Sequence, residues 1–176
     1  MTTDPRYPLG QFVRPATFNE AQVATWIAEI DALPGEFRRA LTGLSEQQLD
    51  TPYRDGGWTV RQVAHHLPDS HMNGYIRFKL ALTERVPVIK PYEEALWAEL
   101  PDVRAVPVET PITIIELVHQ KWVALLRGMG HKTFYRSYFH PEQGRVVPLF
   151  EALAMYAWHG RHHVAHVMMG RERAGA

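Results

Sequence analysis

Apolar side chains recur at intervals of three and four residues in four long stretches of the chain, which is the period of an α-helix with one buried face. These stretches cover residues 19–44, 58–83, 110–127 and 148–169. The Pro34–Gly35 pair is expected to kink the first helix or split it in two, and Pro68 to bend the second, because proline removes a backbone hydrogen bond. Gly170 is expected to end the last helix. Four amphipathic helices predict an all-α fold, most simply a four-helix bundle.

The segments between these helices carry turn-forming residues. Residues 86–110 contain several prolines and are expected to form a long crossover, with one helical turn at 92–97. Residues 134–147 resemble a small β-hairpin built around a glycine-containing turn. Ser45 and Thr59 are candidate N-caps, the first for a short helical turn and the second for the second long helix.

The composition narrows the class of protein. The length predicts a single domain over residues 1–176. Lys plus Arg and Asp plus Glu both total 19, which argues against the basic surface of a nucleic-acid binder. The absence of cysteine excludes disulfides, thiolate metal sites and a cysteine nucleophile. With no apolar run of about 18 residues and no apolar N-terminal stretch, we expect neither a membrane span nor a secretory signal, and a cytoplasmic location.

Histidine is the residue type that points to chemistry. The chain has ten, and four of them lie between His159 and His166. His159 and His163 are four residues apart on the inward stripe of the last helix, so both project from one face and can hold one divalent ion. The second helix offers His66 on its own inward stripe. The pair His162 and His166 has the same spacing and stays open as an alternative.

The remaining histidines have weaker claims. His65 and His71 lie on the second helix, and His71 is a candidate for lining the site. His119 is expected to have a surface or packing role, and His131 and His140 are expected to lie solvated in loops. Histidines on facing core stripes would be costly to bury without a shared partner, so the pattern favours a metal site over isolated core histidines.

Several segments also resemble a known family. The second helix carries GWTVRQVAHHL at 57–67 followed by DSHMN at 69–73, and the last helix carries WHGRHHVAH at 158–166. Shorter matches occur at 7–10, 75–84, 90–92 and 138–141. Together they resemble the DinB/YfiT-like superfamily, and the YfiT branch most closely.

This resemblance implies a four-helix bundle with one divalent ion held by His66, His159 and His163. It implies a metal-dependent hydrolase or, as for one member of the branch, a bacillithiol S-transferase, and it implies a homodimer. Pro68 departs from the family pattern two residues after His66, so the backbone near that ligand is expected to differ.

Three neutral imidazoles leave a divalent ion its full charge and an open fourth position, which is the pattern of a catalytic zinc site. We expect one Zn²⁺ per chain, with Ni²⁺ or Mn²⁺ as alternatives. Such an ion lowers the pKa of bound water to about 7 or holds a thiol as thiolate. The expected function is activation of a nucleophile, with a low-molecular-weight thiol as cosubstrate. A hydrolase using metal-bound hydroxide and a non-catalytic metal-binding bundle are the alternatives.

Other side chains are candidates for supporting roles around a small-molecule substrate. Asp69 is a candidate for orienting a ligand imidazole or for a solvated surface carboxylate. Three arginines near the two motifs are candidates for binding a cosubstrate carboxylate: Arg61, Arg77 and Arg161. The candidate wall residues are aromatic: Trp58, Trp97, Trp122, Tyr156 and Trp158.

Overall fold

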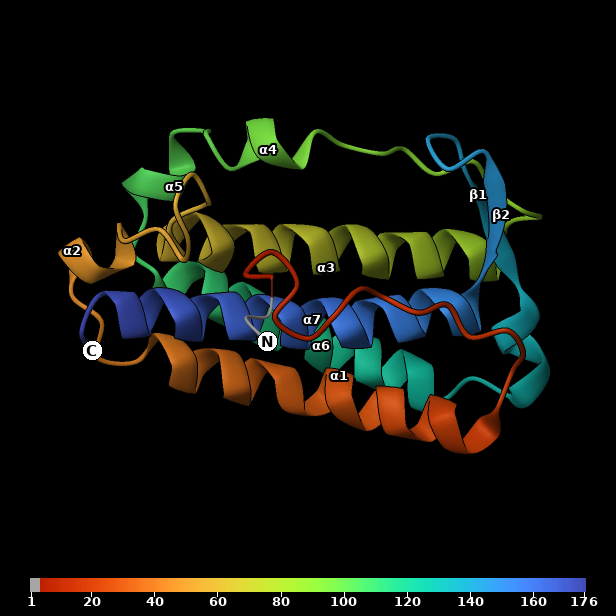
Figure 1. Ribbon diagram of the computed structural model, residues 1–176. Helices are drawn as coiled ribbons and strands as arrows, with labels where there is room; N and C mark the ends of the chain where they lie inside the picture. The colour runs from red at the N-terminus through yellow and green to blue at the C-terminus, as the bar shows by residue number, and fades with distance from the viewer. Residues whose placement is uncertain (1–3) are drawn as a thin grey trace.

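The computed structural model describes residues 4–176 and shows the predicted bundle (Figure 1). Its four long helices are α1 (Glu20–Leu41), α3 (Val60–Thr83), α6 (Glu109–Arg127) and α7 (Leu149–Arg173). Each packs against two others, so that the order around the bundle is α1, α7, α3, α6. The metal-site motifs therefore lie on two neighbouring helices, α3 and α7.

The long connection from α3 to α6 decides the direction of the helices. It contains two short helices, α4 (Glu94–Trp97) and α5 (Asp102–Ala105), of which only the first was predicted. Figure 1 shows this connection running back along α3 to the end of the bundle at which α3 begins. As a result α3 and α6 run in the same direction, and α7 runs antiparallel to α3.

The predicted hairpin closes the opposite end of the bundle. After the short 3₁₀ helix η1 (His131–Tyr135), strands β1 (Ser137–His140) and β2 (Arg145–Pro148) pair antiparallel. Gly144 in the turn has a φ of 61°, a backbone conformation that glycine adopts without steric cost. The hairpin leads directly into α7 (Figure 1).

Side-chain caps define where two helices begin, as predicted. Thr59 and Gln62 form a capping box at the start of α3, and Ser45 and Gln48 form one at the start of α2 (Glu46–Leu49). Each box satisfies backbone N–H groups that have no partner within the helix. The cap at Thr59 places His66 in the second turn of α3.

One of the three expectations about helix interruption, the end of the last helix at Gly170, is wrong. Of the two outcomes expected at Pro34, the split does not occur, and the second helix runs through Pro68 to Thr83 as expected. Both prolines are buried, so core packing of the flanking residues offsets the single lost hydrogen bond. The last helix does not end at Gly170 either, but continues to Arg173. A Cβ at this glycine would overlap Cγ2 of Val60, so its small size permits close packing of α7 on α3.

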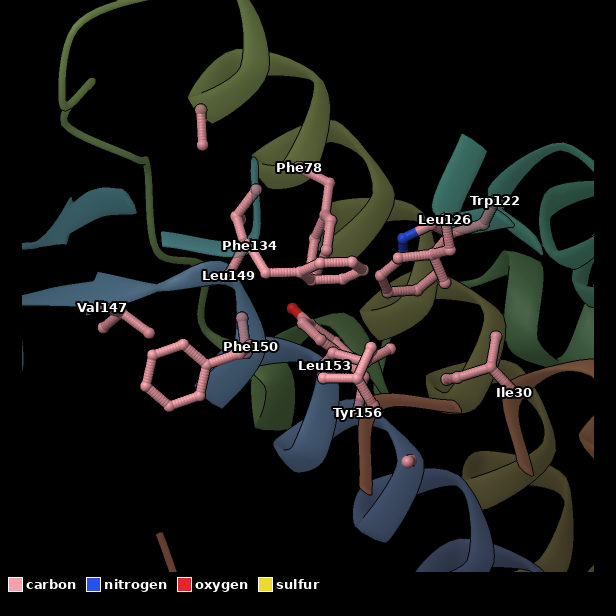
Figure 2. Packing of buried hydrophobic residues seen from close by; sticks show 14 of the residues in the cluster. Ile30, Phe78, Trp122, Leu126, Phe134, Val147, Leu149, Phe150, Leu153 and Tyr156 are labelled. Atoms are coloured by element: carbon pink, nitrogen blue, oxygen red, sulfur yellow. The ribbon is translucent and has the colours of Figure 1, made fainter. Parts of the chain in front are cut away.

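Two clusters of buried apolar side chains fill the bundle. One lies toward the hairpin, and Figure 2 shows its members Phe78, Trp122 and Tyr156 packed together. The other lies toward α2 and includes Leu33, Phe37, Val63, Leu67, Ile115 and Val167. Along α3, α6 and α7 a histidine stands between the residues of one cluster and those of the other: His71, His119 and His159. No helix within residues 4–176 is long and apolar enough to cross a membrane.

Candidate metal centre

Three histidines from α3 and α7 converge on one point. His66, His159 and His163 each place a ring nitrogen within 4.8 Å of the other two. The Nε2 atoms of His66 and His159 are 3.4 Å apart, and the rings of His159 and His163 are 4.4 Å apart on adjacent turns of α7. Among the residues that the structure describes, this is the one such group of three or more potential ligand side chains.

These imidazoles have the protonation state that a metal ion requires. Burial lowers the pKa of His66 to about 4, and it lowers the pKa values of His159 and His163 well below the ordinary value. The rings are therefore neutral at pH 7, with a nitrogen lone pair available to a cation. Three neutral imidazole nitrogens at these separations fit a borderline-soft divalent ion such as Zn²⁺.

The alternative pair on α7 faces other parts of the chain. His162 stacks on Trp158 with a ring separation of 4.4 Å, and His166 stacks on Tyr53 at 4.0 Å. The Nδ1 atom of His166 lies 3.3 Å from Nδ1 of His163, so His166 contacts a candidate ligand without belonging to the group of three. His65 is buried but does not join the group of three.

Two histidines with weak claims from the sequence lie behind the site, where His71 contacts it directly and His119 contacts His71. His71 is completely buried, and its Nε2 atom lies 3.3 Å from Nδ1 of His159. On its other side, its Nδ1 atom lies 2.8 Å from Nε2 of His119. The ring of His119 is 1% exposed, so a surface role is excluded. The sequence did contain evidence that His119 is buried, because His119 continues the three-and-four spacing of Ile112, Ile115 and Trp122.

Two further expectations about polar residues are corrected. His140 is not solvated, because it ends β1 with only 7% of its surface exposed, whereas His131 is exposed as expected. The carboxyl group of Asp69 does not hydrogen-bond a candidate ligand among the described residues. Its pKa is raised to about 6 by burial, so it is not a fully solvated carboxylate either.

A cavity of about 370 Å³ opens onto the three imidazoles. Of the aromatic residues expected to line it, Trp58 and Tyr156 do so, while Trp97, Trp122 and Trp158 do not. The other lining residues come mainly from α3, the crossover and the hairpin: Ser70, Arg77, Pro91, Tyr92, Glu94, His140, Glu142 and Met155. The cavity therefore presents polar groups to a small molecule that touches the three-histidine group.

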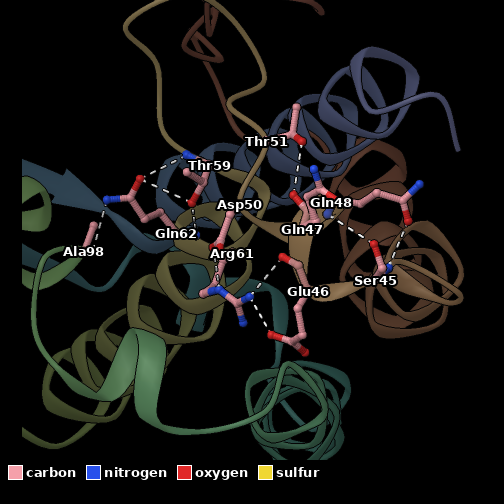
Figure 3. Close-up of polar contacts among 10 residues, drawn as sticks. All are labelled: Ser45, Glu46, Gln47, Gln48, Asp50, Thr51, Thr59, Arg61, Gln62 and Ala98. Atoms are coloured by element: carbon pink, nitrogen blue, oxygen red, sulfur yellow. Dashed lines mark hydrogen bonds and ion pairs between the residues drawn. The ribbon is translucent and has the colours of Figure 1, made fainter.

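Only one of the three candidate arginines lines this cavity. Arg77 does so, and its Nη1 donates a hydrogen bond to the Tyr156 hydroxyl at 3.2 Å. Arg61 is buried and pairs with Glu46 and Asp50 at 2.7 and 2.8 Å (Figure 3). Arg61 therefore links α2, and the residue that directly follows it, to α3, and is not available to a ligand. Arg161 pairs with Glu29 on α1 at 3.1 Å.

The four-helix topology and the three convergent imidazoles define the class of protein, a helical bundle with a candidate three-histidine metal site. A family model of the DinB superfamily matches residues 21–167, so this chain belongs to the DinB superfamily. The resemblance found in the helix motifs is thereby confirmed.

Individual relatives are similar to this protein in sequence or structure over nearly its whole length. A protein of Bacillus cereus (strain 03BB102) named "Putative metal-dependent hydrolase" is 52% identical over 170 residues, which cover 97% of each chain. A Bacillus anthracis protein of the same name is 51% identical over the same span. The solved structure of YfiT from Bacillus subtilis superposes with a TM-score of 0.94 at 42% identity, covering 98% of this chain and 99% of that one. That protein is described as a probable metal-dependent hydrolase with an unusual four-helix bundle topology.

Proposed function

We propose that this protein is a metal-dependent enzyme in which His66, His159 and His163 hold one divalent ion, Zn²⁺, beside a substrate cavity. The observation that carries the proposal is the convergence of three neutral imidazoles, within 4.8 Å of one another, on the wall of a 370 Å³ cavity. Three protein ligands leave a coordination position for a reactant, which distinguishes catalytic from structural zinc sites. When bound, such an ion supplies Lewis acidity that makes a water or a thiol nucleophilic at neutral pH.

Arg77 would orient an anionic group of the substrate or cosubstrate. Its guanidinium lines the cavity and is held by the Tyr156 hydroxyl, while the ion pairs among the described residues leave it without a carboxylate partner. A partly buried guanidinium favours a carboxylate or phosphate, because it can donate two parallel hydrogen bonds to either. This role supports a small anionic molecule as the occupant of the cavity.

The proposed nucleophile is a low-molecular-weight thiol of the bacillithiol type, transferred to an electrophilic carbon. The thiol sulfur forms the new C–S bond, the leaving group departs with its bonding electrons, and the thiol proton passes to solvent. The chain contains no cysteine, so the sulfur must come from a cosubstrate. Arg77 offers that cosubstrate an anchor for a carboxylate.

Hydrolysis of an ester or amide is the second candidate, and the names of the relatives favour it. In that reaction the oxygen of water adds to the acyl carbon and the alcohol or amine leaves. Both reactions use the same cavity and the same three histidines. They differ in whether turnover needs a thiol.

A substrate panel with matched variants decides between these functions. Esters, amides and thiol-plus-electrophile pairs would be assayed with and without chelator, using the wild-type chain, His163→Ala and, as control, His162→Ala. Thiol transfer predicts turnover only with the thiol present, lost on chelation and in His163→Ala, but retained in the control. Turnover of an ester or amide without thiol would establish the hydrolase. If no substrate is turned over in a metal-dependent way, the protein is a non-catalytic metal-binding bundle and the proposal fails.

We further propose that the enzyme acts in the cytoplasm as a homodimer. Large apolar side chains such as Ile76 and Leu117 are more than half exposed on the outer faces of α3 and α6. Two-fold dimers are the commonest soluble assemblies, and these exposed apolar side chains are the candidates for the interface.

A further inference from the structure

A chain of three imidazoles runs from the backbone of α1 to the candidate metal centre. The carbonyl oxygen of Ile30 lies 2.6 Å from Nδ1 of His119, and Nε2 of that ring lies 2.8 Å from Nδ1 of His71. The Nε2 atom of His71 then lies 3.3 Å from Nδ1 of His159. Each of the four long helices contributes one member, and His71 and His119 are at most 1% exposed.

The carbonyl oxygen of Ile30 sets the direction of every hydrogen bond along this row of imidazoles. A carbonyl oxygen can only accept, so Nδ1 of His119 must donate to Ile30. The pKa of His119 is lowered to about 4 by burial, so the ring is neutral at pH 7 and its Nε2 atom must accept. The Nδ1 atom of His71 therefore donates. Complete burial lowers the pKa of His71 well below its ordinary value, so this ring is also neutral, its Nε2 atom accepts, and Nδ1 of His159 donates.

We propose that His119 and His71 are positioning residues that hold His159 in the Nδ1–H tautomer, with the lone pair of Nε2 directed at the metal centre. The Nε2 atom of His159 is the one that lies 3.4 Å from Nε2 of His66, so the fixed tautomer aims the lone pair at the other candidate ligands. A neutral histidine in water prefers the opposite tautomer, with the proton on Nε2. Without the hydrogen bonds from His119 through His71, the proton of His159 would sit on Nε2, the atom that is to bind the metal.

The row of three imidazoles lies in the dry interior of the bundle, and this position bears on its effect at the metal centre. It lies between the two apolar clusters of the bundle, where no water is needed to satisfy any of its ring nitrogens. Partners that orient metal-ligating histidines typically change metal affinity by 10- to 100-fold when removed. The inference rests on the proposed ligand set, but it concerns metal binding and not turnover.

Nitrogen-15 NMR of the histidine rings tests the tautomers directly. In the metal-free wild-type chain at pH 7, we expect His71, His119 and His159 all to carry the proton on Nδ1. A proton on Nε2 of His119 or of His71 would overturn the proposal. This measurement uses the unmodified chain, so it decides even if a variant does not fold.

Zinc affinity, measured by competition with a chromogenic chelator, tests the consequence. His119→Leu leaves His71 without an acceptor and is expected to weaken Zn²⁺ binding about tenfold or more. Ile115→Ala is the matched control, because this residue is also buried on α6, one turn earlier, and contacts no ring of the chain through a hydrogen bond. His119→Gln can donate to the carbonyl and accept from His71 through one amide, so it is expected to restore much of the affinity.

The outcomes separate this inference from the proposed function. Equal weakening in His119→Leu and Ile115→Ala would mean that His119 acts only through core stability, and would overturn the inference. Unchanged affinity in His119→Leu would overturn it as well. Loss of affinity in His119→Leu alone, with rescue by His119→Gln, would support it whether or not any substrate is turned over.

Discussion

Single imidazoles decide whether this bundle binds a metal ion. Purified protein is expected to contain about one divalent ion per chain, measured by elemental analysis. His66→Ala, His159→Ala and His163→Ala should each remove most of it, because two remaining imidazoles hold an ion far less tightly than three. His162→Ala serves as control and should retain the metal, since its ring stacks on Trp158 and meets the candidate ligand His163 only edge-on, at a ring-centroid distance of 5.3 Å. If His162→Ala and His166→Ala remove the metal while His159→Ala and His163→Ala do not, the metal binds on the other face of α7 and this ligand set is wrong.

Burial of these rings also makes the stability of the metal-free chain depend on pH. The pKa of His119 is about 4 in the folded state and about 6.5 when unfolded, so the unfolded state binds more protons below pH 6.5. Stability is therefore lost as pH falls through 6.5 toward 4. This one group is expected to lower the free energy of unfolding by about 2 kcal/mol between pH 7 and pH 5.

Urea denaturation of the metal-free protein at the two pH values measures this effect. His119→Gln removes the titrating group and should lose correspondingly less stability on acidification than the wild-type chain. An equal loss in both proteins would show that His119 does not contribute to the pH dependence.

Close packing between helices gives Gly170 a role that its residue type alone does not reveal. In an exposed helix, replacing glycine by alanine stabilises by up to about 1 kcal/mol. Here the added Cβ would overlap Cγ2 of the completely buried Val60, where α7 crosses the start of α3. Gly170→Ala is therefore expected to destabilise the bundle by about 1–3 kcal/mol.

Chemical denaturation of a double-mutant set measures this contact. In a Val60→Ala background the methyl group that causes the overlap is absent, so Gly170→Ala should cost less than in the wild-type chain. A stabilising effect of Gly170→Ala in the wild-type chain would contradict the packing described here.

The assembled protein is expected to be a homodimer. Light scattering should give a mass of twice 20.2 kDa, and dilution should shift it toward that of one chain only at low concentration. Replacing the exposed Ile76 or Leu117 by lysine tests whether either face takes part, with the exposed Met168 on α7 replaced in the same way for comparison. A mass near 20.2 kDa at every concentration would refute the dimer.

The sequence by itself determined the four long helices, the caps of one of them and of the short helix α2, the hairpin, and candidate histidines on the inward stripes of two helices. Each depends on short-range information. The three-and-four spacing reports which face of a helix is buried, and the serine or threonine three residues before glutamine reports where a helix begins. The pattern also places His159 and His163 on one face, because residues four apart always lie one above the other.

Only the tertiary structure decided which inward-facing groups meet. The spacing could place His71 and His119 inside, but their contact depends on how far α3 and α6 are shifted along each other, which helical spacing does not report. The unsplit course of α1 through Pro34, the continuation of α7 past Gly170, and the pairing of Arg61 with α2 were equally beyond the reach of the sequence. Helical periodicity describes one element at a time. A hydrogen bond or a close glycine contact between two helices depends on how they are shifted along each other. That axial register is set by the packing of the whole bundle.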